Sequence, residues 1–217
     1  MNIAVLGTGI VGRTLASRLN ELGHAVAMGT REAANPTAAE WLASVGTARG
    51  ARVGTFAEAA AHGDVIVNAT SGAASIAALK LAGERNLAGK VLLDVANPLD
   101  MSHGLPPSLS VVNTDSLAEQ IQRSFPDVLV VKSLNTVSAE IMAFPNRLPE
   151  ESQMFVAGND PEAKATVADL LHAFGWRSIL DLGGIEAARG MEMYVMLWVS
   201  LRVVQGTNTF NIRLVRG

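Results

Sequence analysis

The chain has 217 residues, a formal net charge of −3, four scattered histidines and no cysteine. This length suits one α/β domain with a modest addition, and the charge, without any cluster of Lys and Arg, argues against a nucleic-acid partner. The absence of cysteine excludes disulfides, thiolate zinc sites, iron–sulfur clusters and a thiol nucleophile, and we predict no metal site.

The first predicted elements are a strand, a glycine-rich turn and a helix within residues 1–24. Apolar residues before and after the turn have strand and helix spacing. Gly7 permits the tight turn, Gly9 lets the backbone approach a pyrophosphate, and Gly12 lets the helix pack against the strand. Free N–H groups at the helix start would face the phosphates. These features predict a dinucleotide site with contacts from Gly7, Thr8, Gly9, Ile10, Val11 and Gly12.

A second strand, predicted over 25–28, is followed by Gly29, Thr30 and Arg31. An NAD site usually has an acidic residue here, which binds the ribose 2′-hydroxyl and would repel a 2′-phosphate. Thr30 can instead donate a hydroxyl hydrogen bond, and Arg31 supplies a charged fork that matches phosphate geometry. NADP is therefore favoured over NAD. The simpler alternative is that Arg31 is a solvated loop charge.

The rest of the chain alternates strand and helix signals, which is typical of a parallel sheet with crossover helices. Helices are predicted over 36–45, 56–62, 73–82, 116–124, 161–174 and 190–205. Further strands are predicted over 52–55, 64–69, 90–95, 128–131, 153–157 and 179–182. We expect a Rossmann-type, doubly wound, mostly parallel sheet with a small helical C-terminal extension. The expected division is an NADP-binding domain at 1–150 and a strand–helix extension at 151–217 that completes the cleft.

Two further strand ends carry candidate cofactor contacts. In open α/β sheets, ligands lie outside the carboxyl ends of the strands. These ends have Ala69, Thr70 and Ser71 in one segment and Asn97 and Pro98 in another, all small or polar residues that a dinucleotide can approach. Thr70 and Ser71 could equally cap the following helix, and an Asn is a frequent turn residue.

Candidate acid or base side chains are scarce. The suggestive pair is Lys132 and Asn135, in the segment VVKSLNTV. A Lys-x-x-Asn pair serves hydroxyacid dehydrogenases, where it lies on a helix preceded by glycine, whereas here it follows a strand. We therefore predict no catalytic side chain.

The C-terminal helix predicted over 190–205 has apolar residues around most of its circumference. Glu192 and Arg202 interrupt it, and it is shorter than the ~20 residues of a membrane span, so we expect no membrane insertion. A helix apolar on nearly all sides must be covered on nearly all sides, which predicts a homodimer interface. A helix buried entirely within its own chain is the alternative. Because the first residues form a strand and not a secretory signal, we expect a cytoplasmic protein.

Several motifs occur in order along nearly the whole chain. They are GTGIVG at 7–12, GTR at 29–31, DVANPL at 94–99, KSLNTV at 132–137, VAGNDPEAK at 156–164 and GWRSILDLGGIEAARGMEM at 175–193. This ordered set resembles the NADP oxidoreductases that depend on the deazaflavin coenzyme F420. The resemblance implies hydride transfer between F420 and NADP, with both cofactors stacked in a cleft and Asn135 able to hydrogen-bond the deazaflavin. Such a transfer needs no acid or base at the reacting carbon, because orientation of two bound rings supplies most of the catalysis.

Two other functions stay open because this architecture hosts many activities. One is an NADPH-dependent reductase of a small imine, carbonyl or metal-bound substrate, which a pocket too small for a tricyclic ring would favour. The other is a non-enzymatic NADP-sensing module, which a buried nicotinamide end without access for a partner would favour.

Overall fold

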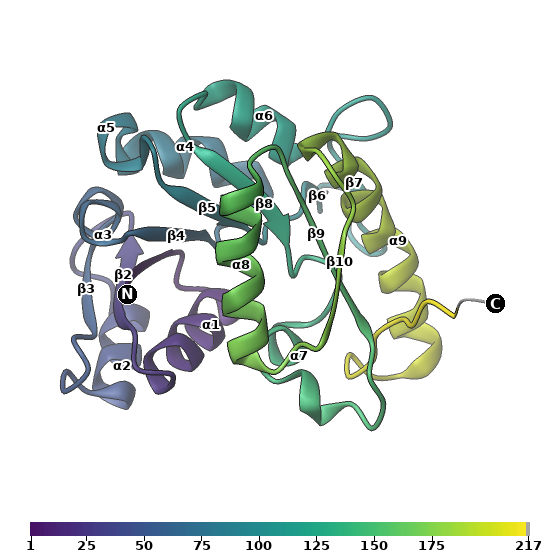
Figure 1. Cartoon of the computed structure of the whole chain (residues 1–217), viewed down its shortest axis with the longest axis horizontal. Coiled ribbons are helices and arrows are strands. Elements are labelled where there is room, and N and C mark those ends of the chain that lie inside the picture. The colour runs from purple at the N-terminus through teal and green to yellow at the C-terminus, as the bar shows by residue number, and fades with distance from the viewer. Residues whose placement is uncertain (216–217) are drawn as a thin grey trace.

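One eight-stranded sheet forms the centre of the fold, and helices cover both of its faces (Figure 1). The computed structural model describes residues 1–215. The strands of this sheet are β1 (Asn2–Leu6), β2 (Ala25–Thr30), β3 (Arg52–Thr55), β4 (Val65–Asn68), β5 (Val91–Asp94), β8 (Leu129–Ser133), β9 (Gln153–Gly158) and β10 (Ser178–Asp181). Their order in space is β10-β9-β8-β5-β4-β1-β2-β3. With β2 and β3 on one side of β1 and β4 and β5 on the other, the predicted Rossmann-type sheet is confirmed.

All neighbouring strands are parallel except β8 and β9, which are antiparallel. The reversal at β9 follows from its connection, which holds only the short helices α7 (Ala139–Ala143) and η1 (Pro145–Arg147). A parallel return would need a full crossover over one face of the sheet. Since β9 and β10 continue the same sheet, the segment predicted as an extension is joined to the nucleotide-binding part by backbone hydrogen bonds. The last two residues of that segment, 216–217, lie outside the described residues.

The helices form two layers around this sheet. One layer holds α1 (Ile10–Glu21), α2 (Pro36–Val45), α7 and α8 (Pro161–Phe174), and the other holds α3 (Phe56–His62), α4 (Gly72–Ala82), α5 (Glu84–Leu87) and α6 (Leu117–Ser124). Alternate residues of β1 serve the two cores: Ile3 and Val5 pack in the first, and Ala4 and Leu6 in the second. This burial on both faces explains the continuous apolar strands of the sequence.

Three helices begin and end where the sequence predicts, at 36–45, 56–62 and 161–174. Each has a side chain that caps its N-terminus. Asn35 accepts from the backbone N–H of Ala38 at 3.0 Å and Asp160 from that of Ala163 at 2.7 Å, while Thr55 and Glu58 form a capping box. Local chemistry therefore fixes these boundaries.

The elements absent from the sequence prediction are short. They are α5, α7, the two 3₁₀ turns η1 and η2 (Ile185–Ala187), and the hairpin of β6 (Leu99–Asp100) with β7 (Ser108–Leu109). Elements of two to five residues are too short to show a period in hydrophobicity. The hairpin lies between residues 95 and 116, where the sequence predicts neither a helix nor a strand.

The C-terminal helix α9 (Ala188–Gln205) lies at the opposite end of the molecule from β3 (Figure 1). Its first half is seated on the domain, with Met191 and Val195 buried, whereas Val203 and Val204 are exposed. After α9 the chain returns to the start of β9, where the N–H of Gln153 donates to the carbonyl of Ile212 at 3.1 Å. Among residues 1–215, no helix combines the length and the apolar character that crossing a membrane requires.

Candidate dinucleotide site

The glycine turn between β1 and α1 has two glycines that the protein itself requires and one that it does not. Gly7 has φ +117°, and a Cβ there would lie 2.5 Å from the carbonyl oxygen of Ala69. A Cβ on Gly12 would lie 2.1 Å from the carbonyl oxygen of Gly7. A Cβ on Gly9, in contrast, would meet no atom within 4 Å among the described residues. The space in front of Gly9 is therefore open to a ligand.

Gly9 is also the N-cap of α1, with φ −67° and ψ 179°. No side chain of the described part of the chain caps this helix. The first N–H groups of α1, which include those of Ile10 and Val11, thus face the open space together with the positive end of the helix dipole. This arrangement suits a phosphate.

A cleft of about 280 Å³ opens beside the turn and brings together three of the predicted segments. Its walls come from the glycine turn, from Arg31 after β2, from the segment after β4 and from α4. The lining residues are Gly7, Thr8, Gly9, Arg31, Phe56, Ala69, Thr70, Ser71, Ala74, Ala77, Ala78 and Leu81. Arg31 is exposed, and within residues 1–215 it forms no ion pair. Its guanidinium is therefore free to bind an anion in the cleft.

Thr30 lies next to Arg31 but does not face the cleft. Its side chain is only 2% exposed, and its hydroxyl contacts the carbonyls of Glu32 and Gly54. These contacts hold the backbone on either side of Arg31. They favour a supporting role for Thr30 over the predicted direct contact with a phosphate.

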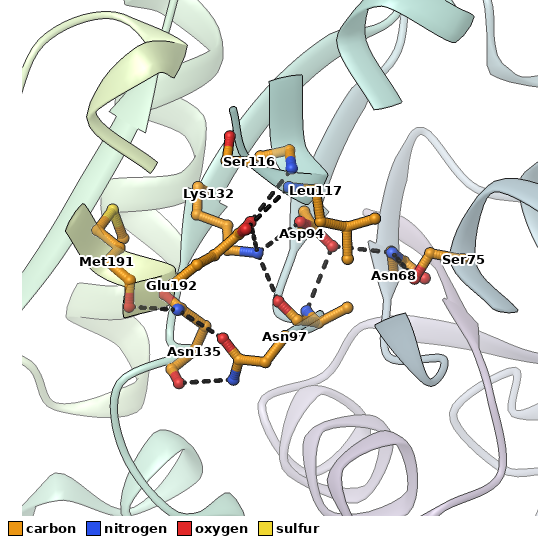
Figure 2. Close-up of polar contacts among 12 residues, drawn as sticks. Asn68, Ser75, Asp94, Asn97, Ser116, Leu117, Lys132, Asn135, Met191 and Glu192 are labelled. Carbon is orange, nitrogen blue, oxygen red and sulfur yellow. Dashed lines mark hydrogen bonds and ion pairs between the residues drawn. The ribbon is translucent and has the colours of Figure 1, made fainter. Parts of the chain in front are cut away.

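The segment after β4 is held in place by Asn68, the last residue of that strand, whose side chain is fully buried. Asn68 Oδ1 accepts from the hydroxyl of Thr70 at 2.6 Å. Its Nδ2 donates to Ser75 Oγ at 3.0 Å and to Asp94 Oδ1 at 2.8 Å (Figure 2). Ser71 precedes α4 as its N-cap residue but makes no side-chain cap. Thr70 is thus oriented by the protein, and Ser71 is exposed at the cleft.

Asn97 and Asn135 form a reciprocal pair between the ends of β5 and β8. Asn97 Nδ2 donates to the carbonyl of Asn135 at 3.0 Å, while Asn135 Nδ2 donates to Asn97 Oδ1 at 2.9 Å and to the carbonyl of Met191 at 3.0 Å (Figure 2). Asn97 is half-buried, Pro98 is buried, and Asn135 is 3% exposed. Asn135 therefore lies behind the surface, where it connects the β5 end to α9.

A buried charge cluster lies beside this pair. Lys132 Nζ is 2.8 Å from Asp94 Oδ2 and 2.8 Å from Glu192 Oε1, and it also donates to the carbonyl of Ala96. Burial acts to lower the pKa of Lys132, but the carboxylates of Asp94 and Glu192 outweigh it and raise that pKa. Burial raises the pKa of Glu192 although Lys132 opposes the shift. Lys132 is thus fully buried, and its ammonium group is occupied by Asp94, Glu192 and the carbonyl of Ala96.

Sequence reasoning missed the role of Glu192. Its carboxylate accepts from the backbone N–H groups of Leu117 at 2.8 Å and Ala118 at 3.2 Å, at the start of α6. The sequence carries a signal for this, because one acidic residue inside an otherwise apolar helix requires a buried partner. We interpreted it only as an interruption of the apolar run.

The fold is that of a Rossmann-type oxidoreductase, and the cleft lies at the carboxyl ends of the strands, where folds of this type bind ligands. Residues 2–98 match the family described as "NADP oxidoreductase coenzyme F420-dependent". A crystal structure from Arthrobacter sp. FB24, described provisionally as an F420-dependent NADP reductase, is 50% identical, covers 99% of each chain and has a TM-score of 0.93. The chain belongs to the family of coenzyme F420-dependent NADP oxidoreductases, which confirms the resemblance predicted from its motifs.

Two curated relatives extend the comparison. The F420-dependent NADP reductase of Methanocaldococcus jannaschii is 26% identical over 220 residues, which are 99% of this chain and 98% of the relative. The metalloreductase STEAP3 of Rattus norvegicus is 32% identical over 191 residues, which are 88% of this chain. The chain spans only 35% of the length of STEAP3, whereas it spans nearly all of the archaeal reductase.

Proposed function

We propose that the protein transfers a hydride between NADP(H) and the deazaflavin coenzyme F420. The observation that carries the NADP part is the open space at Gly9, which faces the same cleft as Arg31. The F420 part is supported by similarity along the full length of reductases that bear this name. The redox chemistry itself is supplied by the two cofactors when they are bound.

The proposed cofactor contacts follow from position. The turn at 7–12 would hold the pyrophosphate on the N–H groups of α1, and Arg31 would pair with the 2′-phosphate. Thr70 and Ser71 would form the opposite wall, and Asn97 and Pro98 would lie further along the strand ends, towards the nicotinamide. Asn135 would act through Asn97, which it holds by two hydrogen bonds.

The chain's own contribution to catalysis is to bind and orient. The lysine closest to the strand ends, Lys132, is enclosed by Asp94 and Glu192 and holds no position from which to transfer a proton to a ligand. Correct placement of two reactants can alone remove about 7–11 kcal/mol from a barrier. We therefore assign no acid or base side chain.

Three further proposals concern the whole molecule. A homodimer is supported by the apolar residues that α9 leaves exposed, among them Leu197, Val203 and Val204. The division at residue 150 stays a prediction, and any such division separates parts that share one sheet. A cytoplasmic location also stays a prediction.

The decisive experiment mixes the purified protein with NADPH and oxidised F420 and follows the absorbance of both chromophores. We expect equimolar loss of NADPH and oxidised F420. Gly9→Val serves as the control that removes cofactor binding. Turnover of NADPH with an imine, a carbonyl compound or a ferric chelate, without turnover of F420, would overturn the proposal in favour of a different reductase. Binding of NADPH without turnover of any acceptor would indicate a sensing module.

A further inference from the structure

A continuous row of polar side chains runs under the strand ends, from α9 to the wall of the cleft. We call it the buried polar chain, and it consists of Glu192, Lys132, Asp94, Asn68 and Thr70. Successive contacts are 2.8 Å from Glu192 to Lys132, 2.8 Å from Lys132 to Asp94, 2.8 Å from Asp94 to Asn68 and 2.6 Å from Asn68 to Thr70. Figure 2 shows the first four side chains directed at one another between α9 and β4.

The four buried residues of the buried polar chain have little freedom to rearrange. Asn68, Asp94, Lys132 and Glu192 are all at least 99% buried. Lys132 has three acceptors for its three N–H groups, from Asp94, Ala96 and Glu192. An ion buried at this depth must keep its partners, because an unpaired charge there is strongly unfavourable. A change in the position of one member therefore requires the others to follow.

Both ends of the buried polar chain lie in parts of the molecule with a proposed function. At one end, Thr70 lines the cleft that also holds Gly9 and Arg31. At the other end, Glu192 attaches the first half of α9 to the N-terminus of α6. The second half of α9 carries the exposed apolar residues. The buried polar chain thus joins the cleft to a helix whose second half exposes apolar side chains.

We propose that Glu192 is a positioning residue, which couples the seating of α9 to the shape of the dinucleotide cleft through Lys132, Asp94, Asn68 and Thr70. The inference rests on the proposed NADP site. When Glu192 loses its charge, Lys132 loses one of two carboxylates and is drawn towards Asp94. The shift of Lys132 alters the hydrogen bond that Asp94 accepts from Asn68. The side chain of Asn68 then moves, and the hydroxyl of Thr70, which donates to it, loses its fixed orientation. The cleft changes although Glu192 never touches the ligand.

A double-mutant cycle between Glu192→Gln and Thr70→Val tests this coupling. The probe is adenosine 2′,5′-bisphosphate, which carries the 2′-phosphate but no nicotinamide and so cannot contact α9 through the ring. Its Kd is measured by calorimetry for the wild type, both single variants and the double variant. We expect Glu192→Gln to weaken binding by roughly fivefold or more, the lower end of coupling between sites. In the Thr70→Val background, the same change should weaken binding by less than about twofold.

Arg189→Gln is the matched control. Arg189 also attaches α9 to α6, through a two-point ion pair with Glu119, but among residues 1–215 its side chain forms no hydrogen bond or ion pair with a member of the buried polar chain. Its loss should change the Kd by less than about twofold, equally in both Thr70 backgrounds. An equal effect of Glu192→Gln in both backgrounds, or an equal effect of Arg189→Gln and Glu192→Gln, would overturn the coupling.

A measurement on the unaltered protein covers the case in which Glu192→Gln does not fold. Coupling is reciprocal, so saturation with adenosine 2′,5′-bisphosphate should slow hydrogen exchange of the amides at 190–196 in α9. Unchanged exchange there would contradict the inference. If the wild type binds the probe and reduces F420 while these tests fail, only the coupling is wrong. If it does not bind the probe, the proposed NADP site is wrong as well.

Discussion

Gly12 lies against the carbonyl oxygen of Gly7 so closely that a Cβ on Gly12 would come within 2.1 Å of it. Gly9, between these two residues, has no described neighbour within 4 Å of the place a Cβ would take. The first contact is internal to the protein, whereas the open space at Gly9 has no packing purpose. Within these six residues, packing of the protein requires glycine at position 12, whereas glycine at position 9 leaves room for a ligand.

Gly9→Val should abolish binding of NADPH without unfolding the protein. The backbone at Gly9 is extended, so any L-residue can adopt it, and the valine side chain would occupy the place proposed for the pyrophosphate. Calorimetric titration should show no measurable binding, and the melting temperature should stay within about 4 °C of the wild type. Normal NADPH binding by this variant would make the turn purely structural.

Gly12→Val should behave in the opposite way. The new side chain would overlap the carbonyl of Gly7, a backbone atom that cannot move without displacing α1 from β1. We expect destabilisation of more than about 4 kcal/mol, measured by urea unfolding. A stable Gly12→Val protein would contradict the close packing of α1 on the turn.

The sequence predicted the elements whose ends depend on local chemistry. Asn35 followed by proline, the pair Thr55 and Glu58, and Asp160 followed by proline each mark a helix start, and the structure has the cap at each of these places. The glycine turn is equally predictable from the sequence, because the spacing of its glycines follows from steric limits within a few residues.

Contacts between distant residues were not predictable in the same way. Lys132 and Glu192 are 60 positions apart, and nothing in the local pattern of either names its partner. The short connection before β9 makes that strand antiparallel only because β8 is its neighbour in the sheet, and the sequence does not show which strand is the neighbour. The orientation of the Thr30 hydroxyl depends on Gly54, which lies on a neighbouring strand. Each of these features is set by tertiary structure and not by sequence spacing.

Arg31→Ala should weaken binding of NADP much more than binding of NAD. The change removes a charge-assisted hydrogen bond to the 2′-phosphate, which contributes about 1.5–3 kcal/mol, or roughly a 10- to 100-fold change in Kd. Titration of both nucleotides into wild type and variant measures the difference. Equal losses for the two nucleotides would refute the assignment of Arg31.

Thr30→Val should act in the same direction with a smaller effect. Valine keeps the volume of the buried side chain but removes the hydroxyl contacts to the backbone at Glu32 and Gly54. The segment that presents Arg31 would then be held less firmly. Adding Thr30→Val to Arg31→Ala should leave the Kd for NADP almost unchanged. If Thr30→Val weakens NADP binding as much in that background as in the wild type, Thr30 contacts the phosphate directly.

The ion pair of Asp115 with Arg123 should make part of the stability dependent on acid pH. Arg123 donates two hydrogen bonds, of 2.9 and 2.8 Å, which lower the pKa of Asp115 from 3.8 to about 2. Because the folded-state pKa is the lower one, the stabilisation is complete above pH 3.8 and is lost as the pH falls towards about 2.

Asp115→Asn should consequently lower the free energy of unfolding at pH 7 by about 1 kcal/mol, a value reduced for the solvent exposure of Arg123. Urea unfolding of both proteins at several pH values should show the difference shrinking below pH 3.8. A difference that is constant from pH 7 to about 2 would show that the effect of the substitution does not come from the charge of Asp115.

The exposed half of α9 is the feature on which the proposed homodimer rests. Leu197 is 55% exposed, Val203 77% and Val204 79%. Trp198 is held within the chain by stacking on Phe210, with ring centroids 5.6 Å apart, so that its substitution would disturb the fold as well as an interface. The exposed valines offer a cleaner test, since their side chains have little packing to lose.

Val203→Glu together with Val204→Glu should convert a dimer into a monomer. Two charges placed in an apolar two-fold interface each meet their own copy or its neighbours, and burial of unpaired carboxylates is strongly unfavourable. Sedimentation equilibrium at micromolar concentration should give twice the chain mass for the wild type and the single chain mass for the variant. Leu105→Glu, at an equally exposed apolar residue outside α9, is the control and should remain dimeric. A wild-type mass that stays at one chain as concentration rises would contradict the dimer, and a dimeric double variant would place its interface elsewhere.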